Sequence, residues 1–151
     1  MRVFRVARKM YCDASGEGAR LYGGRWNLPG DAALYAGSSV AIALLERLTV
    51  DQDLFTTGRD QLYAVMEFDI PNDLIFTPPV ASLPKGWDVV PPSVVSQAYG
   101  SKLIRAGQLC FAVPSVVDTT SRNYVINPHS THFGKVKWQV YPLRIDPRLI
   151  R

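Results

Sequence analysis

The sequence predicts one α+β domain, residues 1–151, built from mixed-strand sheets and a few helices. Three observations lead to this class. The chain has 151 residues, of which 47% are hydrophobic and 20% charged, and this suits a single domain with its own core. Segments with strand patterns outnumber segments with helical patterns. The helical segments are not regularly interleaved with the strands, as a doubly wound parallel sheet would require.

The first third of the chain predicts two strands, a loop between them and one helix. Residues 3–8, VFRVAR, alternate in polarity as a strand does. Residues 12–31 are rich in Gly, Asn, Asp and Pro and predict a loop that could include a short strand at 19–22. Residues 33–37, ALYAG, predict the second strand. Residues 38–50 predict a helix with Ser38 or Ser39 as N-cap and a buried stripe of Ala41, Leu44, Leu45 and Leu48.

The rest of the chain predicts further strands around one more helix. Strand patterns occur at 62–71, 74–79, 109–117, 123–128 and 135–145. An irregular loop carrying KGWD runs from Pro78 to Pro92. The helix follows from about Ser93 to Ala106, with Pro92 near its start and Gly107 as its C-terminal stop.

Composition argues against several classes of protein. No apolar run approaches the roughly 20 residues that cross a bilayer, and the N-terminus lacks the pattern of a signal peptide. Only Cys12 and Cys110 are present, without any CxxC, which fits a reducing cytoplasm and predicts neither a disulfide framework nor a zinc site. The net charge of +4 allows an anionic ligand or an acidic partner without demanding nucleic acid. We therefore expect a cytoplasmic protein without a membrane segment.

Standard catalytic motifs are absent. The sequence has no GxxxxGK[ST], no GxGxxG that opens a helix, and no GxSxG. His129 and His132 lie three residues apart without a nearby carboxylate or thiol, so they indicate a metal only weakly. We predict no metal site.

The stretch LYGGRWNLPGDAALYAG, residues 21–37, places an arginine between two glycines and a tryptophan. An arginine in a cramped, partly apolar setting predicts an anion that meets it, and glycines leave room for that ligand. Each candidate residue also has an ordinary alternative role. Arg25 could stack on Trp26 at the surface, and Tyr35 could pack in the core. Glu46, Ser115 and Asn127 could be, respectively, a solvated helix charge, a small residue at a bend and a turn former.

Taken together, these motifs resemble the RES domain family, named for an arginine, a glutamate and a serine. The specific part is GGRWN, then LYAG, then a helix with ALLE, and the later VPSVV and NYVINP follow in the same order. The resemblance spans nearly the whole chain. It departs after Asn127, where many members have NP-x-HP and this chain has NPHST, so a role for His129 is not implied.

The resemblance implies a fold like that of ADP-ribosyltransferase toxins and NAD as the substrate. It also implies the toxin half of a bacterial toxin–antitoxin pair, whose antitoxin carries an Xre-type DNA-binding domain. The catalytic residues would be Arg25, Tyr35, Glu46 and Ser115. The NAD contacts would be Arg5, Arg25, Trp26, Asn27, Tyr35 and Asn127. No cofactor beyond NAD itself is implied.

These residue types suit cleavage of the bond between nicotinamide and ribose. Positive charge develops on the ribose, and a carboxylate such as Glu46 can stabilise it. Tyr35 can stack on nicotinamide, and arginine offers a planar set of donors to phosphate. The attacking group stays open: inorganic phosphate would give phosphorolysis, a protein acceptor would give ADP-ribosylation, and water would give hydrolysis. The alternative is a small non-catalytic basic module that binds nucleic acid or an acidic protein. The scattered basic residues, without interleaved aromatics, argue against direct nucleic-acid binding.

Overall fold

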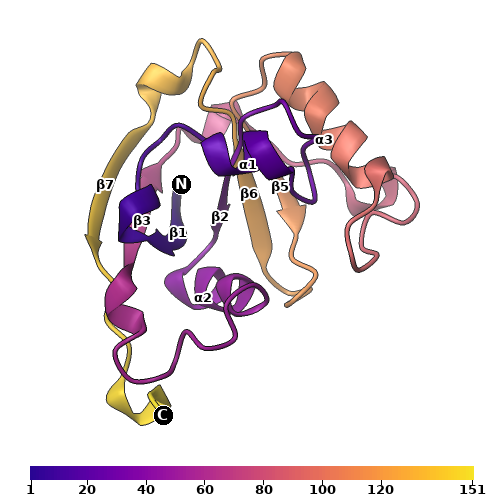
Figure 1. Ribbon diagram of the computed structural model, residues 1–151. Coiled ribbons are helices and arrows are strands. Elements are labelled where there is room, and N and C mark those ends of the chain that lie inside the picture. Colours follow the sequence, from indigo (N-terminus) through magenta and orange to yellow (C-terminus); the bar gives the residue numbers. More distant parts are fainter.

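A seven-stranded mixed sheet, strongly curled, organises the chain in the computed structural model, which describes all residues from Met1 to Arg151 (Figure 1). Its strands are β1 (Arg2–Arg8), β2 (Leu34–Gly37), β3 (Tyr63–Asp69), β4 (Ile75–Phe76), β5 (Cys110–Pro114), β6 (Arg122–Ile126) and β7 (Lys137–Pro142). The helices are α1 (Glu17–Tyr22), α2 (Val40–Leu48) and α3 (Val94–Arg105). The α+β prediction is confirmed.

The sheet is almost divided in two between β1 and β2. Its strand order is β4-β5-β6-β2-β1-β3-β7, and every neighbouring pair is antiparallel except β4 and β5. β1 follows β3 along its full length, from Arg2 opposite Asp69 to Arg8 opposite Tyr63. β1 meets β2 only at Phe4 opposite Gly37. The two halves therefore diverge beyond this pair and leave side chains, not backbone bonds, to fill the space between them.

Three hydrophobic clusters hold the halves and the helices together. One joins both halves of the sheet, with Val3 and Phe68 from one half and Leu34 and Tyr124 from the other. The second lies between α3 and the sheet and contains Trp26. The third lies between α2 and the β1–β3 half of the sheet. Figure 1 shows α2 across the end of β2 and α3 beside β5 and β6. None of the helices combines the length and apolar character that crossing a membrane requires.

The prediction of a loop or strand at 19–22 is wrong, because Glu17–Tyr22 forms α1. Gly16 enters the helix in the left-handed conformation, at φ +67°, and a Cβ there would lie 2.9 Å from the backbone N of Ala33. Asn27 donates from its side chain to the carbonyl oxygen of Ala19 at 2.8 Å. The helix is therefore fixed by partners that lie outside its own segment.

The prediction of α2 is confirmed, with Ser39 as N-cap accepting from the backbone N of Ile42 at 3.2 Å. The predicted buried stripe is wrong in part. Ile42 and Ala43 are the buried residues, whereas Ala41 and Leu45 are exposed. Leu44 and Leu48 are half-buried against the third cluster. α2 crosses the end of the sheet where β1 and β2 diverge. The face of α2 that packs on the sheet therefore differs from the stripe that residue spacing predicts.

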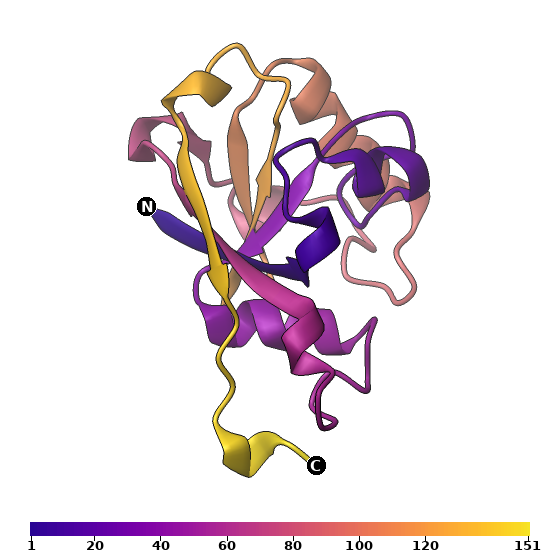
Figure 2. The same ribbon diagram turned by 60° about the vertical axis from the view of Figure 1, so that its left-hand side comes forward.

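The other elements lie close to their predicted positions, and the observed strands from β2 onward are shorter than the predicted ranges. α3 ends before Gly107, which has a φ of +88° and so takes the left-handed conformation that stops a helix. After β7 the chain continues away from the sheet to its C-terminus (Figure 2). There the backbone N of Arg151 donates to the carbonyl oxygen of Phe55 at 2.9 Å. The loop after α2 is thus held by the end of the chain.

Candidate functional site

Glu46 is the centre of a hydrogen-bonded group that joins three elements. It lies near the C-terminal end of α2 and is half-buried. Its Oε1 accepts from Ser115 Oγ at 2.6 Å and from Asn123 Nδ2 at 2.7 Å. Ser115 directly follows β5, and Asn123 is on β6. The structure therefore brings the predicted Glu46 and Ser115 together.

The Ser115 hydroxyl has a fixed direction. Ser115 is fully buried, and its Oγ accepts from the backbone N of Val117 and of Asp118, at 3.1 Å each. With both acceptor positions of the oxygen occupied, its one O–H points to Glu46. Glu46 Oε1 is thereby saturated, while Oε2 has no hydrogen-bond partner within the protein. The carboxylate is held at one oxygen and offers the other.

Arg25 is held by the loop that carries KGWD. Its Nη1 donates to the carbonyl oxygens of Trp87 at 2.9 Å and Val89 at 2.7 Å. The indole of Trp87 stacks on that of Trp26, with ring centroids 6.0 Å apart. Burial lowers the pKa of Arg25, and the negative charge of Glu46 is the largest influence in the opposite direction. Arg25 and Glu46 therefore share one electrostatic environment, and the other guanidinium nitrogens of Arg25 have no protein partner.

Tyr35 carries its hydroxyl into the turn that holds Arg25. Its OH donates to Asn27 Oδ1 at 2.6 Å and accepts from the backbone N of Trp26 at 3.0 Å. Burial raises the pKa of this phenol. A Cβ on Gly24 would lie only 2.6 Å from the hydroxyl oxygen, so this glycine is needed for the close approach. The hydroxyl is a structural group here, whereas Tyr35 as a whole residue is only partly buried.

Trp26 and Asn27, predicted as NAD contacts, have no surface to offer a ligand. Trp26 is 2% exposed and packs edge-on against Tyr99 and Phe111. Asn27 is fully buried, and its Nδ2 donates to the carbonyl oxygens of Ala19, Leu28 and Asp31. A buried amide that satisfies three carbonyls stabilises a loop. Both residues build the turn that presents Arg25, and a direct contact of either with NAD stays a prediction.

Arg5 lies where β1 and β2 diverge, beside Tyr35. Its Nη1 donates to the carbonyl oxygen of Tyr35 at 3.4 Å, and its buried Nε has no partner. Burial lowers the pKa of Arg5, and the positive charge of Arg47 lowers it further. Arg47 lies over the ring of Tyr63, 5.5 Å from its centroid, and its buried Nε is also unpartnered. Two neighbouring guanidinium groups with spare donors favour an anionic ligand.

Asn127, also predicted as an NAD contact, lies elsewhere. It follows the far end of β6, about 13 Å along the strand from Asn123. Its Nδ2 donates to the carbonyl oxygen of Ile104 at 3.1 Å, and its Oδ1 accepts from the backbone N of His129 at 3.0 Å. The structure thus gives Asn127 a turn-forming role and separates it from Glu46.

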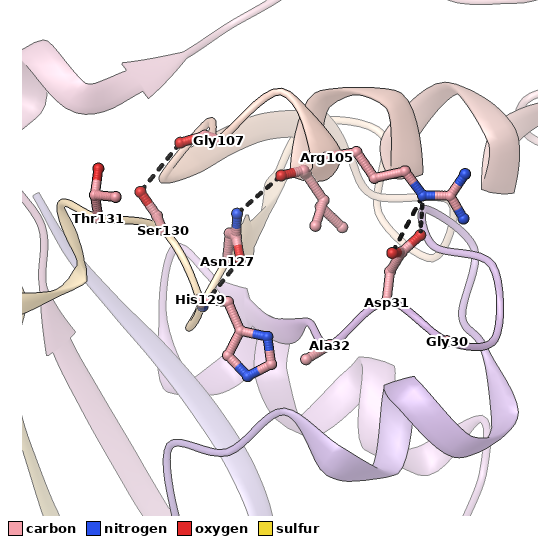
Figure 3. A pocket seen from close by; sticks show the side chains of 10 residues that line it. Gly30, Asp31, Ala32, Arg105, Gly107, Asn127, His129, Ser130 and Thr131 are labelled. Carbon is pink, nitrogen blue, oxygen red and sulfur yellow. Dashed lines mark hydrogen bonds and ion pairs between the residues drawn. The ribbon is translucent and has the colours of Figure 1, made fainter.

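Asn127 and His129 line a polar hollow of about 280 Å³ (Figure 3). Arg105 and Asp31 form an ion pair across its rim at 3.0 Å. A second hollow, more apolar and about 430 Å³, lies beside β7 and includes Tyr141 and Leu143. Neither hollow includes Arg25, Glu46 or Ser115. Nowhere do three or more His, Cys, Asp or Glu side chains gather as ligands for a metal ion.

Asn123 and Arg47 are two residues of this region that the sequence did not predict. Asn123 begins the NYVINP segment, in which only the second asparagine was selected. The pairing of Asn123 with Gly37 places it beside α2, because α2 begins shortly after Gly37. Arg47 directly follows Glu46 in the sequence and lies outside the motifs that were selected. Sequence spacing carries no signal for either, since both depend on the way α2 crosses the sheet.

Comparisons with known proteins agree with one another. The family model described as "RES domain" matches residues 2–146. A protein of Photorhabdus laumondii named "Toxin Res" is 33% identical over 158 aligned residues, which cover 100% of this chain and 98% of that protein. A Sphingobium protein named "Prs ADP-ribosylating toxin" is 36% identical over 144 residues, covering 92% of this chain and 88% of that one.

A solved structure shares the fold. In the M. tuberculosis MbcT-MbcA toxin-antitoxin complex, one chain matches this structure with a TM-score of 0.76 at 24% identity. The match covers 98% of this chain and 85% of that one. At this level of identity the likeness concerns the arrangement of the curled sheet and its helices.

Proposed function

This chain belongs to the RES domain family, and we propose that it is the toxin of a toxin–antitoxin pair and cleaves the nicotinamide–ribose bond of NAD. The two relatives named as toxins support the first part. One observation carries the second part. Glu46 is held at Oε1 by two donors and offers an unpartnered Oε2 in the environment of Arg25. A fixed carboxylate with one free oxygen suits a reaction in which positive charge develops on a sugar.

Glu46 stabilises the ribose as nicotinamide departs. Ser115 and Asn123 keep the carboxylate in place, so little reorganisation is needed when charge develops. Nicotinamide leaves as a neutral base, and the proposed step therefore needs no strong general acid. The ring of the half-buried Tyr35 offers a surface for stacking on nicotinamide.

Arginine side chains bind the phosphates in this proposal. The guanidinium nitrogens of Arg25 that do not hold the KGWD loop are free to donate to the diphosphate of NAD. Arg5, with its unpartnered Nε beside Arg47, is the second phosphate contact. No resident metal or cofactor is part of the proposal.

Two acceptors for ADP-ribose are supported by different observations. Arg47, whose buried Nε is also unpartnered, favours a second anion, and inorganic phosphate as the nucleophile would make the reaction a phosphorolysis. The name of the Sphingobium relative favours transfer of ADP-ribose to a protein. Hydrolysis by water is the third outcome that an assay would reveal.

An antitoxin partner is part of the proposed function, because an NAD-consuming enzyme must be restrained in its host. We propose that an Xre-type partner covers the surface around Arg25 at which NAD would bind. An acidic side chain or a terminal carboxylate of the partner would pair there with the free guanidinium nitrogens of Arg25. The partner and NAD would then compete for the same surface.

The experiment is incubation of the purified chain with NAD, with and without inorganic phosphate and with and without a bacterial lysate. Products are separated by mass. A phosphate-dependent ADP-ribose phosphate supports phosphorolysis, and a labelled protein band supports transfer. If NAD is not consumed under any condition, the enzymatic proposal is wrong and a non-catalytic binding module is favoured.

A further inference from the structure

Asn123 carries a buried acceptor without a partner, directly beside Glu46. Its Oδ1 is one of four buried side-chain polar atoms that have no hydrogen bond within the protein; the others belong to Arg5, Arg47 and Ser93. An unpaired buried acceptor destabilises the folded state, so such atoms are rare in native structures. Its position next to a proposed catalytic carboxylate suggests that a donor arrives with the ligand.

The orientation of this amide is determined by its neighbour. Nδ2 of Asn123 donates to Glu46 Oε1 at 2.7 Å, and a flipped amide would place Oδ1 against the carboxylate oxygen, acceptor against acceptor. The backbone is fixed as well, because Asn123 is paired with Gly37 on β2 and with Val113 on β5. Oδ1 is therefore a preoriented acceptor, held on a central strand.

Two acceptors without a protein partner consequently belong to this one hydrogen-bonded pair of side chains. Glu46 keeps Oε2 free because Ser115 and Asn123 both bind Oε1. Asn123 keeps Oδ1 free because its amide nitrogen is the group that binds Glu46. A ligand that satisfies both must present two adjacent donors without negative charge. The vicinal hydroxyls of a ribose fit this requirement, whereas a phosphate carries negative charge and would be repelled by the Glu46 carboxylate.

We propose that Asn123 is a substrate-binding residue whose Oδ1 accepts a hydrogen bond from one hydroxyl of the nicotinamide ribose of NAD, while Glu46 Oε2 accepts from the neighbouring hydroxyl. This inference rests on the proposed function, since it names NAD as the ligand. It adds a contact that discriminates ribose from deoxyribose at the sugar that reacts. It also explains why an asparagine, with both a donor and an acceptor, occupies this position.

The test compares NAD with two analogues whose nicotinamide ribose lacks either the 2- or the 3-hydroxyl. We would measure kcat/KM for each substrate with the unchanged protein and with Asn123→Ala. If Asn123 accepts from one hydroxyl, removal of that hydroxyl lowers kcat/KM about three- to ten-fold further in the unchanged protein than in the variant. Asn123→Ala should lose activity on NAD, yet become indifferent to that one hydroxyl. A merely structural role for Asn123 would reduce turnover of all three substrates by the same factor.

Two controls keep the result interpretable. Asn72→Ala changes an exposed asparagine remote from Glu46 and should leave all three substrates unaffected. Asn123→Ser is the second variant if Asn123→Ala fails to fold, because serine keeps a short polar group on the strand. If removing either hydroxyl lowers kcat/KM by the same factor in Asn123→Ala as in the unchanged protein, the inference is overturned, whereas the proposed NAD cleavage stands. An unchanged protein that does not consume NAD would overturn the proposed function, and this inference with it.

Discussion

Ser115 Oγ donates to Glu46 Oε1 across 2.6 Å, between two residues separated by 69 positions in the chain. The bond joins the turn after β5 to the C-terminal part of α2. Because two backbone N–H groups occupy the acceptor positions of the hydroxyl, its proton has a single destination. The relationship fixes the carboxylate before any ligand binds, which is the form of preorganisation that catalysis by charge requires.

Glu46→Gln should abolish most NAD turnover and growth inhibition while the protein stays folded. The amide oxygen can still accept from Ser115 and Asn123, so the change removes charge and little else. Loss of a transition-state charge contact lowers kcat about 100- to 1000-fold. The matched control is Glu17→Gln on α1, an exposed residue that should have no effect on turnover. Near-normal turnover in Glu46→Gln, with thermal unfolding unchanged, would remove Glu46 from the chemistry.

Arg25→Ala should lose activity by a similar factor of about 100 to 1000 and should also loosen the KGWD loop. Arg25→Lys keeps the charge but not the planar set of donors, and should recover only part of the activity. Backbone hydrogen exchange at Trp87–Val89 would measure the loosening of the KGWD loop. The kcat/KM for NAD would measure the loss of contacts with its phosphates. Arg105→Ala, which breaks the ion pair with Asp31 at the hollow lined by Asn127 and His129, is the control. An Arg25→Ala variant with a loosened loop and full activity would leave Arg25 with a structural role alone.

Tyr35→Phe should lower the free energy of unfolding by about 1–3 kcal/mol, because it leaves Asn27 Oδ1 and the Trp26 N–H without their partner. If the ring stacks on nicotinamide, the folded variant keeps much of its kcat, and Tyr35→Ala loses far more. Urea unfolding and kinetics below the melting temperature separate the two effects. Tyr22→Phe, at an 83% exposed position, should leave stability unchanged. Equal stability of Tyr35→Phe and the unchanged protein would contradict the hydrogen bonds described here.

Gly100→Ala should destabilise the protein by about 3 kcal/mol, since a Cβ at this point of α3 would overlap the carbonyl oxygen of Trp26. The helix would have to move away from the turn that holds Arg25, so activity should fall as well. Gly18→Ala is the contrasting change, because a Cβ there meets nothing within 4 Å. It should stabilise α1 by about 0.5 kcal/mol. Thermal unfolding of Gly100→Ala and Gly18→Ala tests this contrast. Similar melting temperatures for the two variants would contradict the close packing of Gly100 against Trp26.

Asp51→Asn should destabilise the protein in a pH-dependent way. Hydrogen bonds from Arg59 and then from Tyr63 lower the pKa of Asp51 to about 2. The folded pKa lies below the unfolded value of about 3.9, so the stabilisation is fully present above about pH 4 and is lost as pH falls toward 2. Urea unfolding at pH 6 should show a loss of about 1–3 kcal/mol. That loss should shrink at pH 3, and a constant difference between the two pH values would contradict this role.

The sequence by itself located most of the elements and selected Glu46 and Ser115, which the structure brings together. Alternating polarity located β1, short apolar runs located β3 and β6, and the serine before a run of helix-forming residues located the start of α2. These signals are local, because strand alternation and helix capping depend on neighbours a few residues away. The order of the motifs around Arg25, Glu46 and Ser115 also pointed to one family, which the match over residues 2–146 confirms.

Tertiary structure alone decided which polar residues meet. Trp26, Asn27 and Asn127 looked like ligand contacts, yet their side chains are buried in the turns they build. Asn123 and Arg47 gave no signal, yet the first binds Glu46 and the second lies beside Arg5. The reason is that β1 and β2 pair at a single position, so the sheet opens there and α2 crosses its end. Side chains from β1, α2, β6 and the turn after β5 meet near this opening, and no periodicity along the chain encodes where a sheet divides.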